Sequence, residues 1–308
     1  KQQGRVQVSL NGARPDAPFE KRLDADVPPL PQRPDVIAEL SRCDVVFPLI
    51  HGVNGEDGTL QGMLEIFGLP YVGCGVAASA LGMDKTLQKQ MFARAGLRVA
   101  RHVAVTSHEW KRGGDDIAAG IAAAVGYPAF VKPASGGSSV GVSKVRSRED
   151  LGDAVDAALS LDRTIIVEEA VQGREVECGV LGNEEPQASP VGEVIPAGEF
   201  YDYRAKYLED SARLVAPADL PADVSDELRR MAIDAFRSIG GEGFARVDFF
   251  LPGEGAPIVN EINTIPGFTR ISMFPRLWAL AGIAYGELIS RLVDLAMARF
   301  SAREALSA

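Results

Sequence analysis

The sequence is poor in cysteine and histidine, with three of each among its 308 residues. Cys43, Cys74 and Cys178 lie far apart, are odd in number and follow no Cys-x-x-Cys or Cys/His spacing. The spacing therefore gives no support to a disulfide framework or a zinc site. We expect reduced, buried thiols in a cytoplasmic protein, because disulfides are rare in reducing compartments.

Long hydrophobic runs are also absent. No apolar run approaches the roughly 18 residues that a membrane-spanning helix needs. No signal peptide leads the chain, which begins at Lys1. We therefore expect no membrane partner.

An excess of positive charge is absent as well, since 32 Lys and Arg face 42 Asp and Glu, for a net charge of −10. Nucleic-acid binding requires clustered basic residues, so we expect no nucleic-acid partner. Any anionic nucleotide would have to be held by local cations. With 46% hydrophobic and 24% charged residues, the chain has an ordinary globular composition and a length that suggests two or three packed units.

The most informative stretch is residues 241–275, where two runs rich in Val, Ile and Phe flank a Pro-Gly-Glu-Gly turn. This pattern predicts a β-hairpin centred near Glu254, with Asp248 opposite Asn260 and Glu261. Alternate residues of a strand share a face, so Arg246 would lie beside Asp248 and Asn263 beside Glu261. Carboxylate and amide oxygens suit Mg²⁺ better than zinc. The alternative is a surface ion pair and a solvated glutamate.

A second candidate follows the apolar residues 43–50, which predict a buried parallel strand. A glycine-rich loop at 51–59 and a helix at 60–67 come next. Strand, loop and helix in succession would place His51 and Glu56 at the carboxyl end of a sheet, where ligand sites gather. A polar turn with a satisfied histidine remains the alternative.

A third candidate combines Lys132 with the small residues that follow it. Residues 127–132 and 140–145 predict strands, and the loop between them contains Gly136, Gly137 and two serines. Because Lys132 precedes the glycines and a strand follows them, this is not a Walker loop. Its backbone N–H groups can still surround phosphate oxygens. The alternative is a flexible hairpin tip.

The rest of the chain gives coarser signals. Six prolines within residues 11–35 predict an irregular segment, and residues 199–213 predict a polar, tyrosine-rich lid loop. Further strands are expected at 69–75, 164–167 and 173–180. Helices are expected at 83–95 (carrying Lys85), 150–160, 225–239 and 285–300.

Taken in order, several motifs of this chain resemble the ATP-grasp superfamily and, within it, the D-alanine–D-alanine ligase family. The resemblance extends from about residue 43 to the C-terminus. The motifs are His51-Gly-Val-Asn-Gly-Glu-Asp-Gly, Gln61-Gly62, Met83-Asp-Lys85, Val131-Lys-Pro with Gly-Ser-Ser-Val-Gly, Phe200-Tyr-Asp-Tyr-Arg-Ala-Lys-Tyr207, Arg246-Val-Asp248 and Asn260-Glu-Ile-Asn-Thr-Ile-Pro-Gly267-Phe.

The resemblance implies an ATP-grasp fold of α/β and α+β type. It would have an N-terminal parallel-sheet α/β domain (1–74), a central ATP-grasp lid subdomain (75–171) and a C-terminal α+β catalytic subdomain (172–308). ATP would be clamped between the last two. The family opens with a strand, a Gly-Gly loop and a Glu that holds the first D-alanine's ammonium. We expect this opening to be missing from the sequence, because an alignment that places Gln7 at the Glu is followed by prolines where a helix should be.

The family roles carry over to matching positions. The resemblance implies two Mg²⁺ (or Mn²⁺) ions held by Asp248, Glu261 and Asn263, and leaves open a monovalent cation. Catalytic roles fall to Arg246, Ser138, Tyr207 and the Gly267 N–H, and substrate binding to His51, Lys206 and Ser272. ATP binding falls to Lys85, Lys132, Gly137, Ser138, Ser139, Glu168, Val171, Glu175 and Phe250.

The implied activity is an ATP-dependent ligation of two D-alanines through a D-alanyl phosphate, for peptidoglycan synthesis, by a homodimer. Lys206 and Tyr207 favour D-alanine as second substrate, because relatives that make D-alanyl-D-lactate lack the pattern that contains them. The alternatives are a D-alanine–D-lactate or D-alanine–D-serine ligase and a non-catalytic ATP-binding relative.

Overall fold

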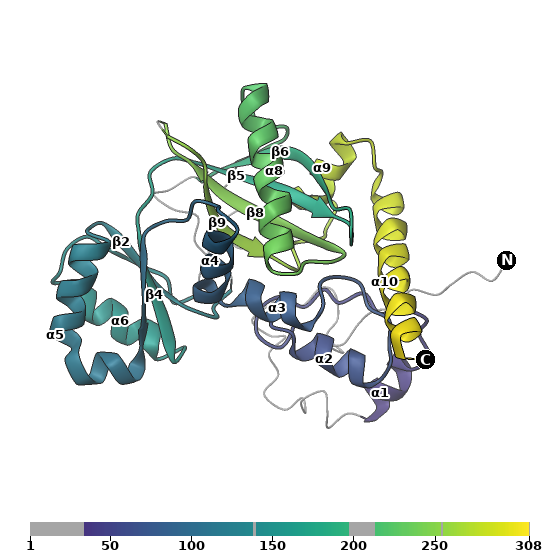
Figure 1. Ribbon diagram of the computed structural model, residues 1–308, viewed down its shortest axis with the longest axis horizontal. Coiled ribbons are helices and arrows are strands. Elements are labelled where there is room, and N and C mark those ends of the chain that lie inside the picture. Colours follow the sequence, from purple (N-terminus) through teal and green to yellow (C-terminus); the bar gives the residue numbers. More distant parts are fainter. Residues whose placement is uncertain (1–33, 138–139, 197–212, 254, 308) are drawn as a thin grey trace.

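Two antiparallel sheets and the helices around them make up the computed structural model, which describes residues 34–137, 140–196, 213–253 and 255–307 (Figure 1). The four-stranded sheet has the order β1-β4-β2-β3, and the five-stranded sheet has the order β7-β6-β5-β8-β9. The strands are β1 (His102–Thr106), β2 (Ala129–Pro133), β3 (Ser143–Val145), β4 (Thr164–Glu169), β5 (Arg174–Leu181), β6 (Gln187–Ile195), β7 (Arg213–Val215), β8 (Phe244–Leu251) and β9 (Ile258–Asn263).

The helices cover these sheets and connect them. Two of them, α5 and α6, pack on the four-stranded sheet, and α8 packs along the five-stranded sheet. The helices are α1 (Pro34–Leu40), α2 (Thr59–Ile66), α3 (Val76–Met83), α4 (Lys85–Arg94), α5 (Ser107–Ala124), α6 (Leu151–Leu159), α8 (Ala222–Ser238), α9 (Met273–Leu280) and α10 (Tyr285–Ser307).

The two faces of the five-stranded sheet differ in chemistry. On β5, the buried Cys178 and Val180 join a core with α8 residues such as Phe236. Strand alternation turns Glu177 and Gly179 to the opposite face, where Gly179 lies against Trp278 of α9. The same alternation on β8 buries Val247 in the α8 core. The face away from α8 therefore carries the polar side chains of the site.

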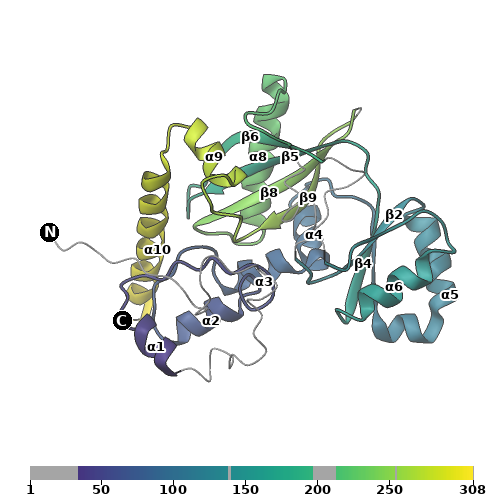
Figure 2. The same cartoon turned by 180° about the vertical axis from the view of Figure 1, so that it is seen from behind.

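Helix α4 lies between the two sheets in both views (Figures 1 and 2). Its Phe92 is fully buried in the core shared by α8 and the five-stranded sheet. Asp84 caps the helix, because its carboxylate accepts hydrogen bonds from the N–H groups of Thr86 (2.8 Å) and Leu87 (3.1 Å). The cap fixes the first turn, which begins with Lys85.

Most predicted elements are present, with shifted ends. The helices expected at 60–67, 150–160, 225–239 and 285–300 are α2, α6, α8 and α10, and the helix expected at 83–95 is α4, separated from α3 by the break at Asp84. The strands expected at 164–167 and 173–180 are β4 and β5, whereas the one expected at 140–145 is the shorter β3. Residues 199–212, which hold most of the predicted lid loop, lie outside the described residues.

The predicted strands at 43–50 and 69–75 are wrong in extent. In the part of the chain that the structure describes, they are reduced to one parallel bridge between Val46 and Tyr71. Pro48 and Pro70 flank the bridge and have no N–H with which to extend the ladder. The prediction of three buried thiols is wrong for Cys43, which is half-exposed. Cys74 and Cys178 are buried, and all three cysteines are free thiols.

No helix among the described residues is long and apolar enough to cross a bilayer.

The domain bounds 1–74, 75–171 and 172–308 stay a proposal. The described cores show one unit built on the four-stranded sheet, with Val131, Val155 and Val167 at its centre. A second core lies between the five-stranded sheet and α8.

Candidate active site

The hairpin of β8 and β9 places two carboxylates opposite each other. In the observed register, Asp248 pairs with Glu261 and Arg246 pairs with Asn263. The predicted hairpin is therefore confirmed, and a register shift just after Asp248 is the irregularity in it. Like charges directly opposite on adjacent strands repel, so these two carboxylates need cations nearby.

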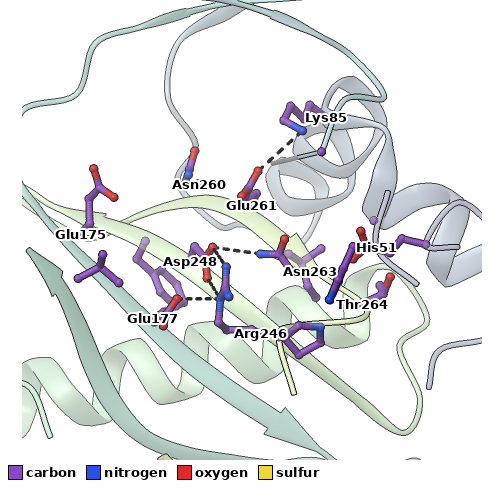
Figure 3. A pocket seen from close by; sticks show the side chains of 18 of the residues that line it. His51, Lys85, Glu175, Glu177, Arg246, Asp248, Asn260, Glu261, Asn263 and Thr264 are labelled. Atoms are coloured by element: carbon purple, nitrogen blue, oxygen red, sulfur yellow. Dashed lines mark hydrogen bonds and ion pairs between the residues drawn. The ribbon is translucent and has the colours of Figure 1, made fainter. Parts of the chain in front are cut away.

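Arg246 neutralises the first of these carboxylates. Its Nε and Nη2 donate to the two oxygens of Asp248, at 2.6 and 2.7 Å, and its Nε lies 2.7 Å from Glu177 Oε2 (Figure 3). The Asn263 amide also donates to Asp248 Oδ2, at 3.0 Å. Burial alone would lower the pKa of Arg246, but Asp248 and Glu177 outweigh it and hold the pKa well above its usual value.

Lys85 neutralises the second carboxylate, that of Glu261. Its Nζ lies 3.8 Å from Glu261 Oε2 (Figure 3). The same Nζ donates to the carbonyl of Gly136 at 2.6 Å. Gly136 belongs to the small-residue loop between β2 and β3. The Lys85 ammonium therefore links Glu261, a predicted metal ligand, to the loop that is predicted to cover the ATP phosphates.

Lys132 lies on β2 diagonally across from Glu168 of β4, because the register pairs Lys132 with Ile166 and Phe130 with Glu168. The Lys132 ammonium donates to Glu168 Oε2 at 2.8 Å. On the other side of the same carboxylate, Lys89 Nζ lies 3.3 Å from Oε1. Burial would raise the pKa of Glu168, but the two ammonium groups outweigh it and lower the pKa to about 2.

The glycine loop after residue 50 brings His51 and Glu56 to the same cavity. The N–H of Gly52 donates to Glu56 Oε2 at 2.6 Å, which folds the loop back on itself. Burial raises the pKa of Glu56. Gly55 has no room for a side chain, because an added Cβ would lie 2.2 Å from the carbonyl oxygen of Ile50.

The segment after β9 forms the remaining wall. Ser272 stands at the N-cap of α9, and its Oγ accepts a hydrogen bond from the Thr269 N–H at 3.0 Å. This bond closes a short loop beside Gly267, and both Gly267 and Ser272 line the cavity.

These walls enclose one cavity of about 600 Å³. Ser138, Ser139, Lys206 and Tyr207 lie outside the described residues. All the other predicted site residues line the cavity: His51, Lys85, Lys132, Gly137, Glu168, Val171, Glu175, Arg246, Asp248, Phe250, Glu261, Asn263, Gly267 and Ser272. In the close-up, Glu175 lies to one side of the Arg246–Asp248 cluster (Figure 3).

Sequence reasoning missed two residues of this region. Glu177, which is 5% exposed and contacts Arg246, was signalled by its spacing of two from Glu175 on one strand. Lys89 was signalled by its spacing of four from Lys85 on one helix. Both spacings place the two side chains on a common face.

The donor set of this cavity fits a hard divalent cation. Asp248 and Glu261 offer carboxylate oxygens, and Asn263 offers an amide, as Mg²⁺ prefers. Among the described residues there is no group of three or more His, Cys, Asp or Glu side chains that could hold a metal ion. Because the protein supplies so few ligands, coordination positions of the cation stay open for phosphate oxygens and water.

Comparison with known proteins identifies the family. Residues 8–74 match the family model of the D-ala D-ala ligase N-terminus, and residues 91–294 match that of the D-ala D-ala ligase C-terminus. The chain belongs to the D-alanine–D-alanine ligase family. It is 52% identical to the D-alanine–D-alanine ligase of Geobacillus thermodenitrificans, over 86% of this chain and 72% of that protein. It is also 52% identical to the Bacillus licheniformis ligase, over 85% of this chain and 72% of that protein.

Two solved structures of this family superimpose on the chain. The D-alanine-D-alanine ligase from Coxiella burnetii has a TM-score of 0.76 and 37% identity, covering 86% of this chain and 70% of that one. The VanG D-Ala:D-Ser ligase from Enterococcus faecalis has a TM-score of 0.75 and 37% identity, covering 82% and 73%. These neighbours confirm the predicted ATP-grasp fold class.

Proposed function

We propose that this chain is an ATP-dependent ligase that joins two D-alanines to D-alanyl-D-alanine for peptidoglycan synthesis. Relatives that match it over most of their length bear that name. The observation that carries the proposal is the pairing of Asp248 with Glu261 in a cavity that also holds Lys85 and Lys132. Two carboxylates and two ammonium groups around one cavity suit a nucleotide phosphate transferred with a divalent cation.

The reaction has two steps. A carboxylate oxygen of the first D-alanine attacks the γ-phosphorus of ATP, and ADP leaves with the electrons of the broken P–O bond. The amine of the second D-alanine, having lost a proton, then attacks the acyl carbon of the D-alanyl phosphate. The nitrogen loses a second proton as inorganic phosphate leaves with the electrons of the broken C–O bond, and the peptide bond remains. Catalysis of this type depends on positioning and charge neutralisation more than on a protein nucleophile.

The proposed ATP site lies between the two sheets. Lys85 and Lys132 hold phosphate oxygens, beneath the loop of Gly137, Ser138 and Ser139. Glu168, the backbone at Val171 and the ring of Phe250 border the adenosine, and Glu175 accepts from the ribose hydroxyls. Supporting this division, Glu175 lies to one side of the charged cluster (Figure 3).

Asp248, Glu261 and Asn263 would hold two Mg²⁺ ions, which neutralise phosphate charge when bound. Arg246 and the Gly267 N–H stabilise the oxyanion at the attacked carbonyl. Arg246 is suited to this role, because Asp248 and Glu177 fix its guanidinium from two sides.

Amino-acid recognition is proposed for the remaining wall. Ser272 and Lys206 receive the carboxylate of the second D-alanine, His51 contacts substrate, and Ser138 and Tyr207 join in a substrate-binding hydrogen-bond network. We further propose a homodimer in the cytoplasm, as the family resemblance implies, and a monovalent cation requirement.

ADP release tests the proposal. The full chain with Mg²⁺ and ATP should release ADP when D-alanine is added, and less with D-serine or D-lactate. A preference for D-serine would instead match the D-Ala:D-Ser ligase activity for which VanG is named. Binding of ATP without any ADP release that depends on the added acceptor would identify a non-catalytic ATP-binding relative instead.

A further inference from the structure

Lys89 is the most deeply buried charged side chain near the site, and none of the roles above uses it. Its side chain is 1% exposed. The Nζ lies 3.3 Å from Glu168 Oε1 and donates to the backbone carbonyl of Asn260 at 3.0 Å. An ammonium group this buried requires such partners, because an unpaired buried charge is costly.

Glu168 is shared between two lysines. Its Oε2 accepts a hydrogen bond from Lys132 at 2.8 Å, whereas Oε1 has no hydrogen-bond donor within the described residues and only the ion pair with Lys89. The carboxylate is 2% exposed, so water does not replace a lost partner. The position of Lys132, which lines the cavity, therefore depends on how Glu168 is held from behind by Lys89.

The second contact of Lys89 reaches the other side of the cavity. Asn260 precedes Glu261 on β9, and its carbonyl accepts the Lys89 hydrogen bond. The neighbouring Gln88 makes a parallel contact, because its Oε1 accepts from the N–H of Ile262 at 3.0 Å. Helix α4 is thus attached to β9 on both sides of Glu261, and Lys89 also contacts β4 through Glu168.

We propose that Lys89 is a positioning residue that couples the two halves of the nucleotide site: it sets the place of Lys132 through Glu168 and supports β9 through the Asn260 carbonyl. The inference rests on the proposed ATP-dependent function. It assigns Lys89 no contact with substrate. Without Lys89, the whole charge of Glu168 acts on Lys132, which draws that ammonium away from phosphate.

The test compares Lys89→Met, Glu168→Gln and the double variant. We expect Lys89→Met to raise the KM for ATP and the dissociation constant of a non-hydrolysable ATP analogue about tenfold or more, since hydrogen bonds to charged groups contribute that much. The KM for D-alanine should stay unchanged. Because Lys89 acts on Lys132 through the Glu168 carboxylate, the two substitutions should not be additive. The double variant should bind the ATP analogue no more weakly than the weaker-binding single variant.

Asn183→Leu is the matched control, since it removes two hydrogen bonds between distant segments, to the Leu295 carbonyl and from the Gly243 N–H, and Asn183 does not line the cavity. It should lower the melting temperature and leave analogue binding near the wild-type value. Equal weakening by Asn183→Leu and Lys89→Met, or additive effects in the double variant, would reduce Lys89 to a packing role and overturn the inference.

If Lys89→Met does not fold, Lys89→Gln keeps a donor for the Asn260 carbonyl without the charge, and the same weakening of analogue binding is expected. An unchanged KM for ATP in Glu168→Gln would overturn the inference whichever Lys89 variant folds.

Failure of the proposed function can be told apart from failure of this inference. Wild-type protein that binds the analogue but releases no ADP with D-alanine rejects the ligase while leaving the Lys89 binding test intact.

Discussion

Asp248 and Glu261 lie directly opposite each other on β8 and β9. Each has its own cation, Arg246 for Asp248 and Lys85 for Glu261. The two carboxylates come from one hairpin, but the lysine comes from a helix that lies more than 160 positions before either of them in the chain. The proposed metal site therefore depends on the packing of α4 as well as on the hairpin.

Glu261→Gln should lower kcat about 100-fold or more while the fold is kept, because one charged oxygen ligand of the divalent cation is lost. The thermal transition should be unchanged or slightly higher, since the repulsion with Asp248 is removed. ADP release measured across a Mg²⁺ titration checks this. The control is Glu287→Gln, which removes an exposed carboxylate of α10 that pairs with Arg291. Wild-type turnover at saturating Mg²⁺ would remove Glu261 from the metal site.

Glu177→Gln should lower kcat about tenfold to 100-fold, because the Arg246 guanidinium loses one of its two charged partners. Arg246 still pairs with Asp248, so the KM for ATP should change little. Steady-state kinetics with each substrate varied in turn separates these effects. A raised KM for ATP at unchanged kcat would place Glu177 in nucleotide binding and not behind Arg246.

Asp84→Ala should lower the free energy of unfolding by about 1 kcal/mol and also raise the KM for ATP. The N-cap side chain fixes the first turn of α4, and Lys85 is the first residue of that turn. Asp84→Asn keeps a capping oxygen and is expected to stay close to wild type in both properties. Urea denaturation and ATP kinetics on the same preparations check the pair. Loss of stability without any kinetic effect would separate the cap from Lys85.

Acid should destabilise the protein through Glu168. Its pKa is lowered from 4.5 to about 2 in the folded state, so it stabilises the fold fully above pH 4.5 and progressively less as the pH falls toward 2. This carboxylate is 2% exposed, and at neutral pH its lowered pKa contributes on the order of 3 kcal/mol to the free energy of unfolding. Urea denaturation between pH 7 and 2.5 should show a smaller loss of stability for Glu168→Gln than for wild type. Parallel curves for the two proteins would contradict this assignment.

Only Cys43 should react with a thiol reagent in the folded protein at pH 8. Burial raises the pKa of the Cys74 and Cys178 thiols to about 12, and neither presents a thiolate to solvent. A disulfide-exchange reagent should titrate one thiol per chain in buffer and three in denaturant. Cys43→Ser should then give none in buffer. Rapid labelling of two or more thiols in the native wild type would show that these cores open.

Local signals in the sequence suffice for the hairpin, because strand alternation and a Pro/Gly turn involve only neighbouring residues. They place Asp248 opposite Asn260 and Glu261, and in the structure its partner is Glu261, with a register shift just after Asp248 that the pattern does not predict. The family also follows from sequence, because its motifs occur in a fixed order along the chain. The helix α8 follows from its apolar stripe.

Which charges share a partner depends instead on tertiary packing. Lys89, Lys132 and Glu168 come from a helix and two strands that are distant in sequence, and no local pattern predicts that one carboxylate serves both lysines. The parallel strand expected at residues 43–50 is reduced to a bridge for the same reason, since pairing depends on a neighbour and Pro48 limits it. Periodicity is a property of neighbouring residues, whereas burial and ion pairing arise when distant segments pack.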